Sequence, residues 1–345
     1  MTTIVTEATT VEDPANLMMK ARPKVPEPKI ARSYTLHMQG DWGRANLHRA
    51  LGWLGYELLR LSGEHTQFAI WNGRGQRDNL RAVGRGEVDI ALVVPEPFVK
   101  MGVEGLGPCA GETYPHVKSL GYVPQHDRLV VAVRKEFGIR SFEDLRRKKP
   151  KLRVTLGPDD GISFIGMGAK YLLQYSGVSR EQLVEWGGTL IEYDEPRACT
   201  REMLDGNADA IIMEAVMTSY WHEMANKVDL DFIPIEPKAR DALMRDLGWP
   251  SSKLPKGYAR GMDEEMEFLD FSHFLLCATT DLPDDIAYAI AWAMVERWDT
   301  IEMQYRHIKP ERSPISYPLD PKAICRASIP LHPGAERYYR DAGHL

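Results

Sequence analysis

Two loops carry residues whose types suit the binding of an organic anion. Trp42 and Arg44 follow a predicted strand, where an indole ring could stack on a ligand while a guanidinium group holds its carboxylate. Asn72 and Arg77 lie in and just after a second glycine-bearing loop, where an arginine can form a two-pronged contact with a carboxylate. Each loop could also be an ordinary solvated turn. The sequence therefore offers these four residues only as candidates for ligand binding.

A third loop joins a predicted strand to a predicted helix. Apolar and polar residues alternate over 151–156, and the turn 157–161, which contains glycine and proline, ends the strand. Ser163 is placed to cap a helix that begins just after it, and the free N–H groups there could bind a carboxylate or a phosphate. Asp159 and Asp160 would repel an anion, which favours either a capping role or a ligand bridged by a metal ion.

Asp41 and Glu214 are the carboxylates that could move a proton if the protein is an enzyme. Glu214 follows the predicted strand 208–213, so its side chain would enter a cleft from a strand end. There it could act as a general base with a raised pKa, or bind an amine or a metal ion. Tyr220 could cover the bound ligand. No nucleophile, metal-ligand or dinucleotide motif is present in the sequence, so catalysis has no positive motif.

The composition is that of an ordinary globular protein and excludes several classes of partner. The 345 residues are 43% hydrophobic and 27% charged, with a formal net charge of −6 and a pI near 6.0. Nucleic acid and anionic membranes are therefore poor partners. The four cysteines are far apart, so we expect buried free thiols. No cofactor is evident, and a divalent metal ion stays open.

Residues 1–30 do not resemble a targeting segment. They lack a basic start and an apolar run of signal-peptide length, and no later stretch reaches the ~20 apolar residues that a membrane helix needs. Taken literally, the sequence predicts a cytoplasmic protein, or a periplasmic one if the start is incomplete. We expect residues 1–30 to form a flexible or extended arm that wraps the body or a second subunit, and through which the chain could assemble into a homo-oligomer.

The elements that must position the candidate residues alternate between strands and helices. In the first third of the chain, the pattern predicts strands at 34–38, 67–72 and 88–94 and one long helix at 46–61. The same plan recurs in the middle of the chain. This order predicts an α/β fold with mostly parallel sheets, in which ligands bind beyond the C-terminal ends of the strands.

Five phrases, taken in order, resemble the TAXI-type solute receptors of TRAP transporters. Over about 34–340 they read HMQGDWGRAN, NGRGQRDNLRAVGRGEVDIALV, DLRRKKPKLRVTLGPDDGIS, LDGNADAIIMEA and IPLHPGAERYY. The resemblance implies a type II periplasmic-binding-protein-like fold with two lobes and a ligand cleft between them. We expect lobe I to comprise 31–125 plus 237–345 and lobe II to comprise 126–236. Membrane transporter subunits would be partners if the protein is exported.

Three functional hypotheses follow. In the first, the lobes close on a small organic acid, with Arg77 and helix N-termini binding its carboxylate and Trp42 and Tyr220 covering it. In the second, the chain is a cytoplasmic decarboxylase or lyase acting on an aromatic or other carboxylate, metal-assisted or not, with Asp41 and Glu214 as catalytic residues. In the third, it is a ligand sensor or assembly subunit that makes contacts through its N-terminal arm.

Overall fold

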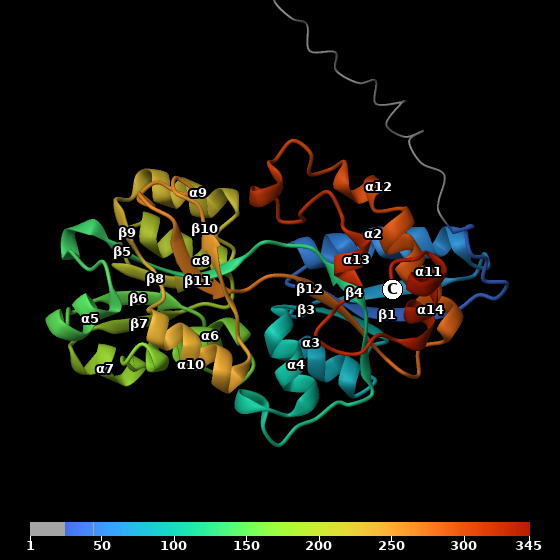
Figure 1. Ribbon diagram of the computed structural model, residues 1–345, viewed down its shortest axis with the longest axis horizontal. Helices are drawn as coiled ribbons and strands as arrows, with labels where there is room; N and C mark the ends of the chain where they lie inside the picture. The colour runs from blue at the N-terminus through green and yellow to red at the C-terminus, as the bar shows by residue number, and fades with distance from the viewer. Residues whose placement is uncertain (1–24, 44) are drawn as a thin grey trace, which may run out of the picture.

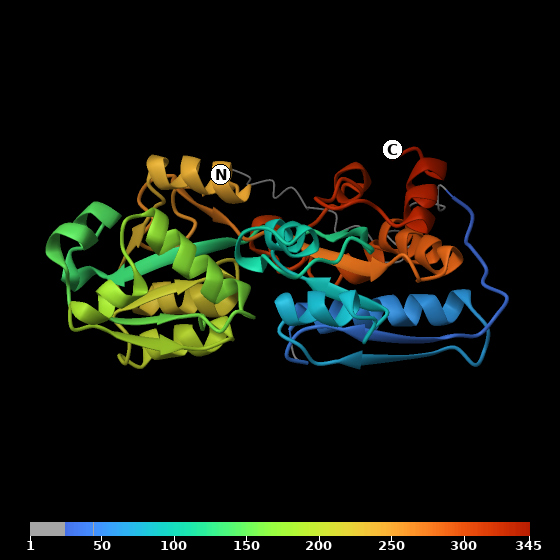
Figure 2. The same ribbon diagram turned by 90° about the horizontal axis from the view of Figure 1, so that it is seen from below.

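The chain folds into two α/β lobes that lie side by side (Figure 1). The computed structural model describes residues 25–43 and 45–345. In the view turned by 90°, the lobes again stand apart along the long axis and meet at the centre of the molecule (Figure 2). Each lobe has its own sheet, which confirms the predicted two-lobe α/β fold.

Lobe I is built on a five-stranded sheet of order β2-β1-β3-β12-β4. Its strands are β1 (Thr35–Gln39), β2 (Gln67–Trp71), β3 (Ile90–Val93), β4 (Val117–Val123) and β12 (Phe274–Thr279). The first three strands are parallel, whereas β12 runs antiparallel to both β3 and β4. Its helices are α2 (Asn46–Leu61), α3 (Arg77–Gly84), α4 (Glu96–Glu104), α11 (Asp284–Glu296), α12 (Asp299–Glu302), α13 (Pro321–Ile324) and α14 (Pro333–Asp341).

Lobe II is built on a seven-stranded sheet in which β5 pairs with β8, β9 and β11. Its strands are β5 (Arg128–Arg134), β6 (Arg153–Leu156), β7 (Thr189–Glu192), β8 (Ala210–Met213), β9 (Leu230–Ile233), β10 (Ser251–Leu254) and β11 (Met266–Asp270). Its helices are α5 (Phe142–Lys148), α6 (Phe164–Tyr175), α7 (Arg180–Glu185), α8 (Pro196–Leu204), α9 (Ser219–Lys227) and α10 (Pro237–Leu247).

The chain passes between the lobes at two crossovers, 124–127 and 271–273. We expected the return to lobe I at residue 237, and the structure differs. Strand β10 pairs with β11, and β11 pairs with β5, so the segment 237–270 extends the sheet of lobe II. The return comes about 34 residues later than expected because antiparallel pairing between distant strands leaves no local mark on the sequence.

The start of the described chain is packed rather than loose. Residues 25–30 belong to the segment that we expected to be a flexible or extended arm. Val25 and Ile30 are buried, Ile30 donates its N–H to the carbonyl oxygen of Leu61, and Trp292 donates to that of Val25. These six residues therefore lie along lobe I, because two apolar side chains are buried on it. The rest of the arm, and any oligomer contact made through it, lies outside the described residues.

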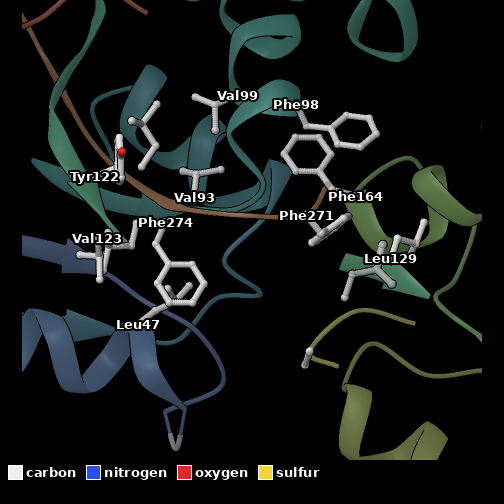
Figure 3. Close-up of a cluster of buried hydrophobic side chains, with 14 of the residues drawn as sticks. Leu47, Val93, Phe98, Val99, Tyr122, Val123, Leu129, Phe164, Phe271 and Phe274 are labelled. Atoms are coloured by element: carbon white, nitrogen blue, oxygen red, sulfur yellow. The ribbon is translucent and has the colours of Figure 1, made fainter. Parts of the chain in front are cut away.

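The lobes share a dry aromatic contact beside the crossovers (Figure 3). Phe98 of α4 and Phe164 of α6 are fully buried and stack with ring centroids 4.8 Å apart. Trp249 meets the edge of Phe98 at 4.7 Å, and Phe271 of the second crossover packs on Trp249. Burial of these rings joins the two lobes beside the crossovers.

All four cysteines are buried and free, as predicted: Cys109, Cys199, Cys277 and Cys325. Their pKa values are raised, in each case chiefly by burial. They therefore act as small apolar residues of the core.

Candidate functional site

Loops from both lobes enclose a cavity of about 540 Å³. Lobe I contributes the start of α2 and the segment near Arg312, and lobe II contributes the starts of α8 and α9. A smaller inner cavity of about 80 Å³ adjoins it and reaches the crossovers at Gln125 and Phe271. The two cavities share the lining residues Trp42, Ala45, Asn46, Pro196, Met217, Thr218 and Tyr220. Their combined size suits a small solute.

Three helix N-termini converge on the outer cavity, those of α2, α8 and α9. Within the described chain, the N-cap residues of these helices, Ala45, Glu195 and Thr218, accept no side-chain cap hydrogen bond. The hydroxyl group of Thr218 instead donates to the carbonyl oxygen of Ala215. The start of α2 already binds the carboxylate of Asp41. Because the first N–H groups of a helix carry a partial positive charge, the starts of α8 and α9 favour an anionic ligand.

The charged side chains that line the outer cavity also favour an anionic ligand. Among the described residues they are Arg49, Arg197 and Arg312 against the single carboxylate of Glu195. Burial, with a smaller contribution from Arg312, lowers the pKa of His222 to about 4, so its ring is neutral near pH 7. The outer cavity therefore carries a net positive charge.

Glu214 lines the inner cavity and interacts with a second carboxyl group, that of the fully buried Asp127. Asp127 accepts hydrogen bonds from the backbone N–H groups of Arg128, Ala215 and Val216, at 2.6, 2.7 and 3.1 Å. Burial and the neighbouring Asp127 raise the pKa of Glu214 well above its ordinary value. Since three N–H groups favour the ionised form of Asp127, the proton shared by the pair resides on Glu214.

Ala215 holds the turn that aims Glu214 into the inner cavity. Its φ is +66°, in the left-handed region that a residue with a Cβ rarely adopts. The backbone N–H groups of Ala215 and Val216 both donate hydrogen bonds to Asp127, and these two bonds hold Ala215 in this conformation. The local strain therefore serves to place a protonated carboxyl group at the end of β8.

Four predicted site residues line the cavities. Trp42 and Tyr220 line both of them, while Glu214 and Asp41 line the inner one. Asp41 is occupied, however, because its carboxylate accepts from the N–H groups of Leu47 at 2.9 Å and Ala45 at 3.4 Å. Asp41 thus stabilises the start of α2, which is a positioning role.

Three other predicted residues stand outside the cavity linings: Asn72, Arg77 and Ser163. The guanidinium group of Arg77 donates to the carbonyl oxygens of Pro108 and Gly161 and pairs with Glu112 at 3.3 Å. It therefore ties the lobes together and has no free face for a solute. Arg44 lies outside the described residues.

Ser163 is a helix cap, and its loop is too tight to admit an anion. Its hydroxyl group accepts from the N–H of Gly166 at 3.1 Å, and its own N–H donates to Asp160. A Cβ added to Gly166 would lie 1.8 Å from the carbonyl oxygen of Pro158, which shows how closely the loop folds onto α6. The expected capping role is present, and the space needed for a phosphate or carboxylate is filled.

Most of the polar lining comes from residues that no sequence pattern marked as site residues. They are Gln76, Gln125, Arg49, Arg197 and Arg312. One signal was available for Arg197, since it follows a proline that opens a helix right after a strand and a short loop. The others depend on which loops meet in space.

A metal-binding role has no support in the geometry. Within residues 25–43 and 45–345, no cluster of three or more His, Cys, Asp or Glu side chains could hold a metal ion. In the same ranges, no helix has the length and apolar character needed to cross a bilayer.

A family comparison decides the class of protein. The model of the NMT1-like family matches residues 57–343, which is most of the chain. The chain belongs to this family. NMT1-like proteins are periplasmic solute-binding proteins of the type II superfamily, in agreement with the two lobes and the cavity between them.

Family membership corrects the predicted location. The expectation of a cytoplasmic protein is wrong, because NMT1-like proteins bind solutes in the periplasm. That expectation depended on the composition of residues 1–30 alone, which carries no information about the solute-binding fold. The prediction of solute binding is confirmed at the level of the family, and nothing in the comparisons favours the enzyme alternative.

Solved structures with a similar chain path are solute-binding proteins. A TctC solute-binding protein from Polaromonas is 14% identical, with 90% of this chain and 98% of that chain covered and a TM-score of 0.43. A protein described as a periplasmic transporter is 12% identical, with 90% and 94% covered and a TM-score of 0.45. An ancestral arginine-binding protein bound to arginine is 11% identical, with 78% and 97% covered and a TM-score of 0.41. At such identities, a neighbour's ligand says nothing about the ligand of this NMT1-like chain.

Proposed function

We propose that this NMT1-like protein binds a small organic carboxylate in the cavity between its lobes and delivers it, as a TAXI-type receptor, to the membrane subunits of a TRAP transporter. The observation that carries the proposal is the outer cavity of about 540 Å³, where the N-termini of α8 and α9 and three arginines meet one glutamate. A carboxylate would be drawn in by the net positive charge and held by N–H and guanidinium donors.

Arg197 is the arginine best placed to reach for a ligand. It stands at the start of α8 and is exposed, and its side chain has no hydrogen-bond or ion-pair partner among the described residues. Arg49 and Arg312 are already committed in part, since Arg49 donates to Tyr305 and Arg312 donates to Tyr258 and contacts His222. A guanidinium group without a protein partner needs the least rearrangement to bind an anion.

The rings of Trp42 and Tyr220 would cover the bound acid. Both side chains line the outer and the inner cavity, one from each lobe. Burial raises the pKa of Tyr220, so its hydroxyl group stays protonated and can donate a hydrogen bond. Approach of the two rings on closure would exclude water and strengthen the contacts with the carboxylate.

The proposal is tested by calorimetric titration of the purified protein with propionate, lactate, succinate, malate and benzoate, and with ethanolamine as a cation. We expect at least one acid to bind and the amine not to bind. Arg197→Gln should weaken the tightest acid about tenfold, because a charge-assisted hydrogen bond is lost.

Arg201→Gln provides a matched control on the same helix. Arg201 is exposed and pairs with Asp205 at 2.8 Å, away from the cavity lining. Its substitution should leave the affinity for the acid unchanged. Binding of ethanolamine in place of every acid, or an equal loss of affinity in both variants, would refute the assignment of the cavity to a carboxylate.

A further inference from the structure

The inner cavity contains two buried amide side chains with unused hydrogen-bonding atoms. Gln76 is 1% exposed and Gln125 is 3% exposed, and both line this space of about 80 Å³. The Oε1 atom of Gln76 accepts from the backbone N–H of Ile165 at 3.0 Å, which fixes the amide so that Nε2 is the atom left over. Among the described residues, Gln76 Nε2 has no hydrogen-bond partner.

Gln125 offers the complementary atom from the first crossover. Its Nε2 atom lies 3.9 Å from the sulfur of Met217, and its Oε1 atom finds no hydrogen-bond partner in the described parts of the chain. A buried donor and a buried acceptor in one small polar space call for a group that can accept from one and donate to the other. The volume exceeds what a single water needs.

The charges around the inner cavity argue against an ionic group there. Arg74 is paired with Asp160 and Asp194, at 2.5 and 3.2 Å. The carboxylate of Asp41 is bound by N–H groups of α2, and Glu214 faces Asp127. Among the described residues a carboxylate would find no unpaired cation there and would approach the carboxylate of Asp41, while an ammonium group would face Arg74. A neutral group meets neither penalty.

We infer that the inner cavity receives a hydroxyl group of the solute, whose oxygen accepts from Gln76 Nε2 and whose hydrogen is donated to Gln125 Oε1. This inference rests on the proposed function, since it concerns the same solute, and it narrows that solute to a hydroxy acid. The carboxylate then lies in the outer cavity against Arg197, and the hydroxyl group selects among acids that the arginines alone would not distinguish.

Matched pairs of acids that differ by one hydroxyl group test the inference: lactate with propionate, malate with succinate, and 4-hydroxybenzoate with benzoate. Calorimetric titration gives the ratio of dissociation constants within each pair. We expect one hydroxy acid to bind the wild-type protein at least about tenfold more tightly than its partner. Gln76→Leu and Gln125→Leu should each bring that ratio toward one, whereas Gln174→Leu, on the exposed part of α6, should leave it unchanged.

The outcomes separate this inference from the proposed function. Equal binding within every pair by the wild-type protein, with acids still bound, overturns the hydroxyl assignment and leaves carboxylate binding in place. A hydroxyl preference that survives in both glutamine variants also overturns it, because the cavity would then hold ordered water only. Failure of every acid to bind overturns the proposed function itself. The wild-type ratio decides the question even if a variant does not fold.

Discussion

An ion pair across the cleft should hold the two lobes together, and Arg74→Met should release it. Arg74, in the loop between β2 and α3 of lobe I, pairs with Asp160 at 2.5 Å and with Asp194 at 3.2 Å, both in lobe II. The side chains of Arg74 and Asp160 are 32% and 34% exposed, so solvent screens the attraction. We therefore expect the pair to contribute about 1 kcal/mol to lobe closure, a factor of about five in the ratio of closed to open molecules.

Small-angle X-ray scattering of the ligand-free protein measures this shift directly. Arg74→Met keeps the length of the side chain and removes its charge, so the radius of gyration should increase. The affinity for the tightest acid should fall up to about fivefold, because part of the binding energy must then close the lobes. Addition of 1 M salt should move the wild-type protein in the same direction, since the pair is partly exposed.

Arg153→Met is the control for this experiment. Arg153 pairs with Asp209 at the same distance of 2.5 Å, but both residues belong to lobe II. Its loss should lower the free energy of unfolding without changing the scattering of the folded protein. The reasoning about the ion pair is refuted if the two variants give the same radius of gyration and the same affinity.

Two further predictions concern stability. Burial alone would raise the pKa of Glu112, but hydrogen bonds from Tyr114 and Arg81 outweigh it and the pKa falls to about 2. Because this folded-state value lies below the ordinary 4.5, the carboxylate stabilises the fold above about pH 4.5, and the stabilisation is lost as the pH falls toward 2. In urea at pH 7, Glu112→Gln should lose about 1 to 2 kcal/mol of unfolding free energy, after allowance for partial exposure, and should approach the wild type as the pH falls; a pH-independent difference would contradict this. Phe164→Ala should cost about 3 to 5 kcal/mol in the same assay, because the buried ring stacks on Phe98; a cost under about 1 kcal/mol would show that the contact is not tightly packed.

Local patterns predicted the elements well where burial repeats within one segment. The predicted helix 46–61 has the bounds of α2, because five of its leucines recur at helical spacing and face the core: Leu47, Leu51, Leu54, Leu58 and Leu61. Apolar residues recur at helical spacing over 283–305, yet α11 ends at Glu296 and α12 follows separately. Trp298 continues the apolar stripe and is buried, so the pattern reported burial correctly although the helix is interrupted.

The candidate site was predictable as far as topology determines it. Trp42, Glu214 and Tyr220 lie in the cavities because they follow strand ends, where the loops of an α/β lobe converge. Arg77 occupies a comparable position but is bound by Glu112, which lies 35 residues away in a separate loop. A sequence pattern shows on which loop an arginine lies, but not which carboxylate it pairs with in the folded protein.

The glutamines illustrate a different limit of sequence analysis. Gln76 belongs to the glycine loop from which we chose Arg77, and its functional atom is defined by a bond to Ile165 of the other lobe. Charged residues attract notice in a sequence, yet those of the inner cavity pair with other groups of the protein. The groups left for a solute are neutral amides inside and Arg197 outside. Affinity and specificity would then come from different groups. The arginines would attract any small carboxylate, and the amides of Gln76 and Gln125 would favour the acid that carries a hydroxyl group.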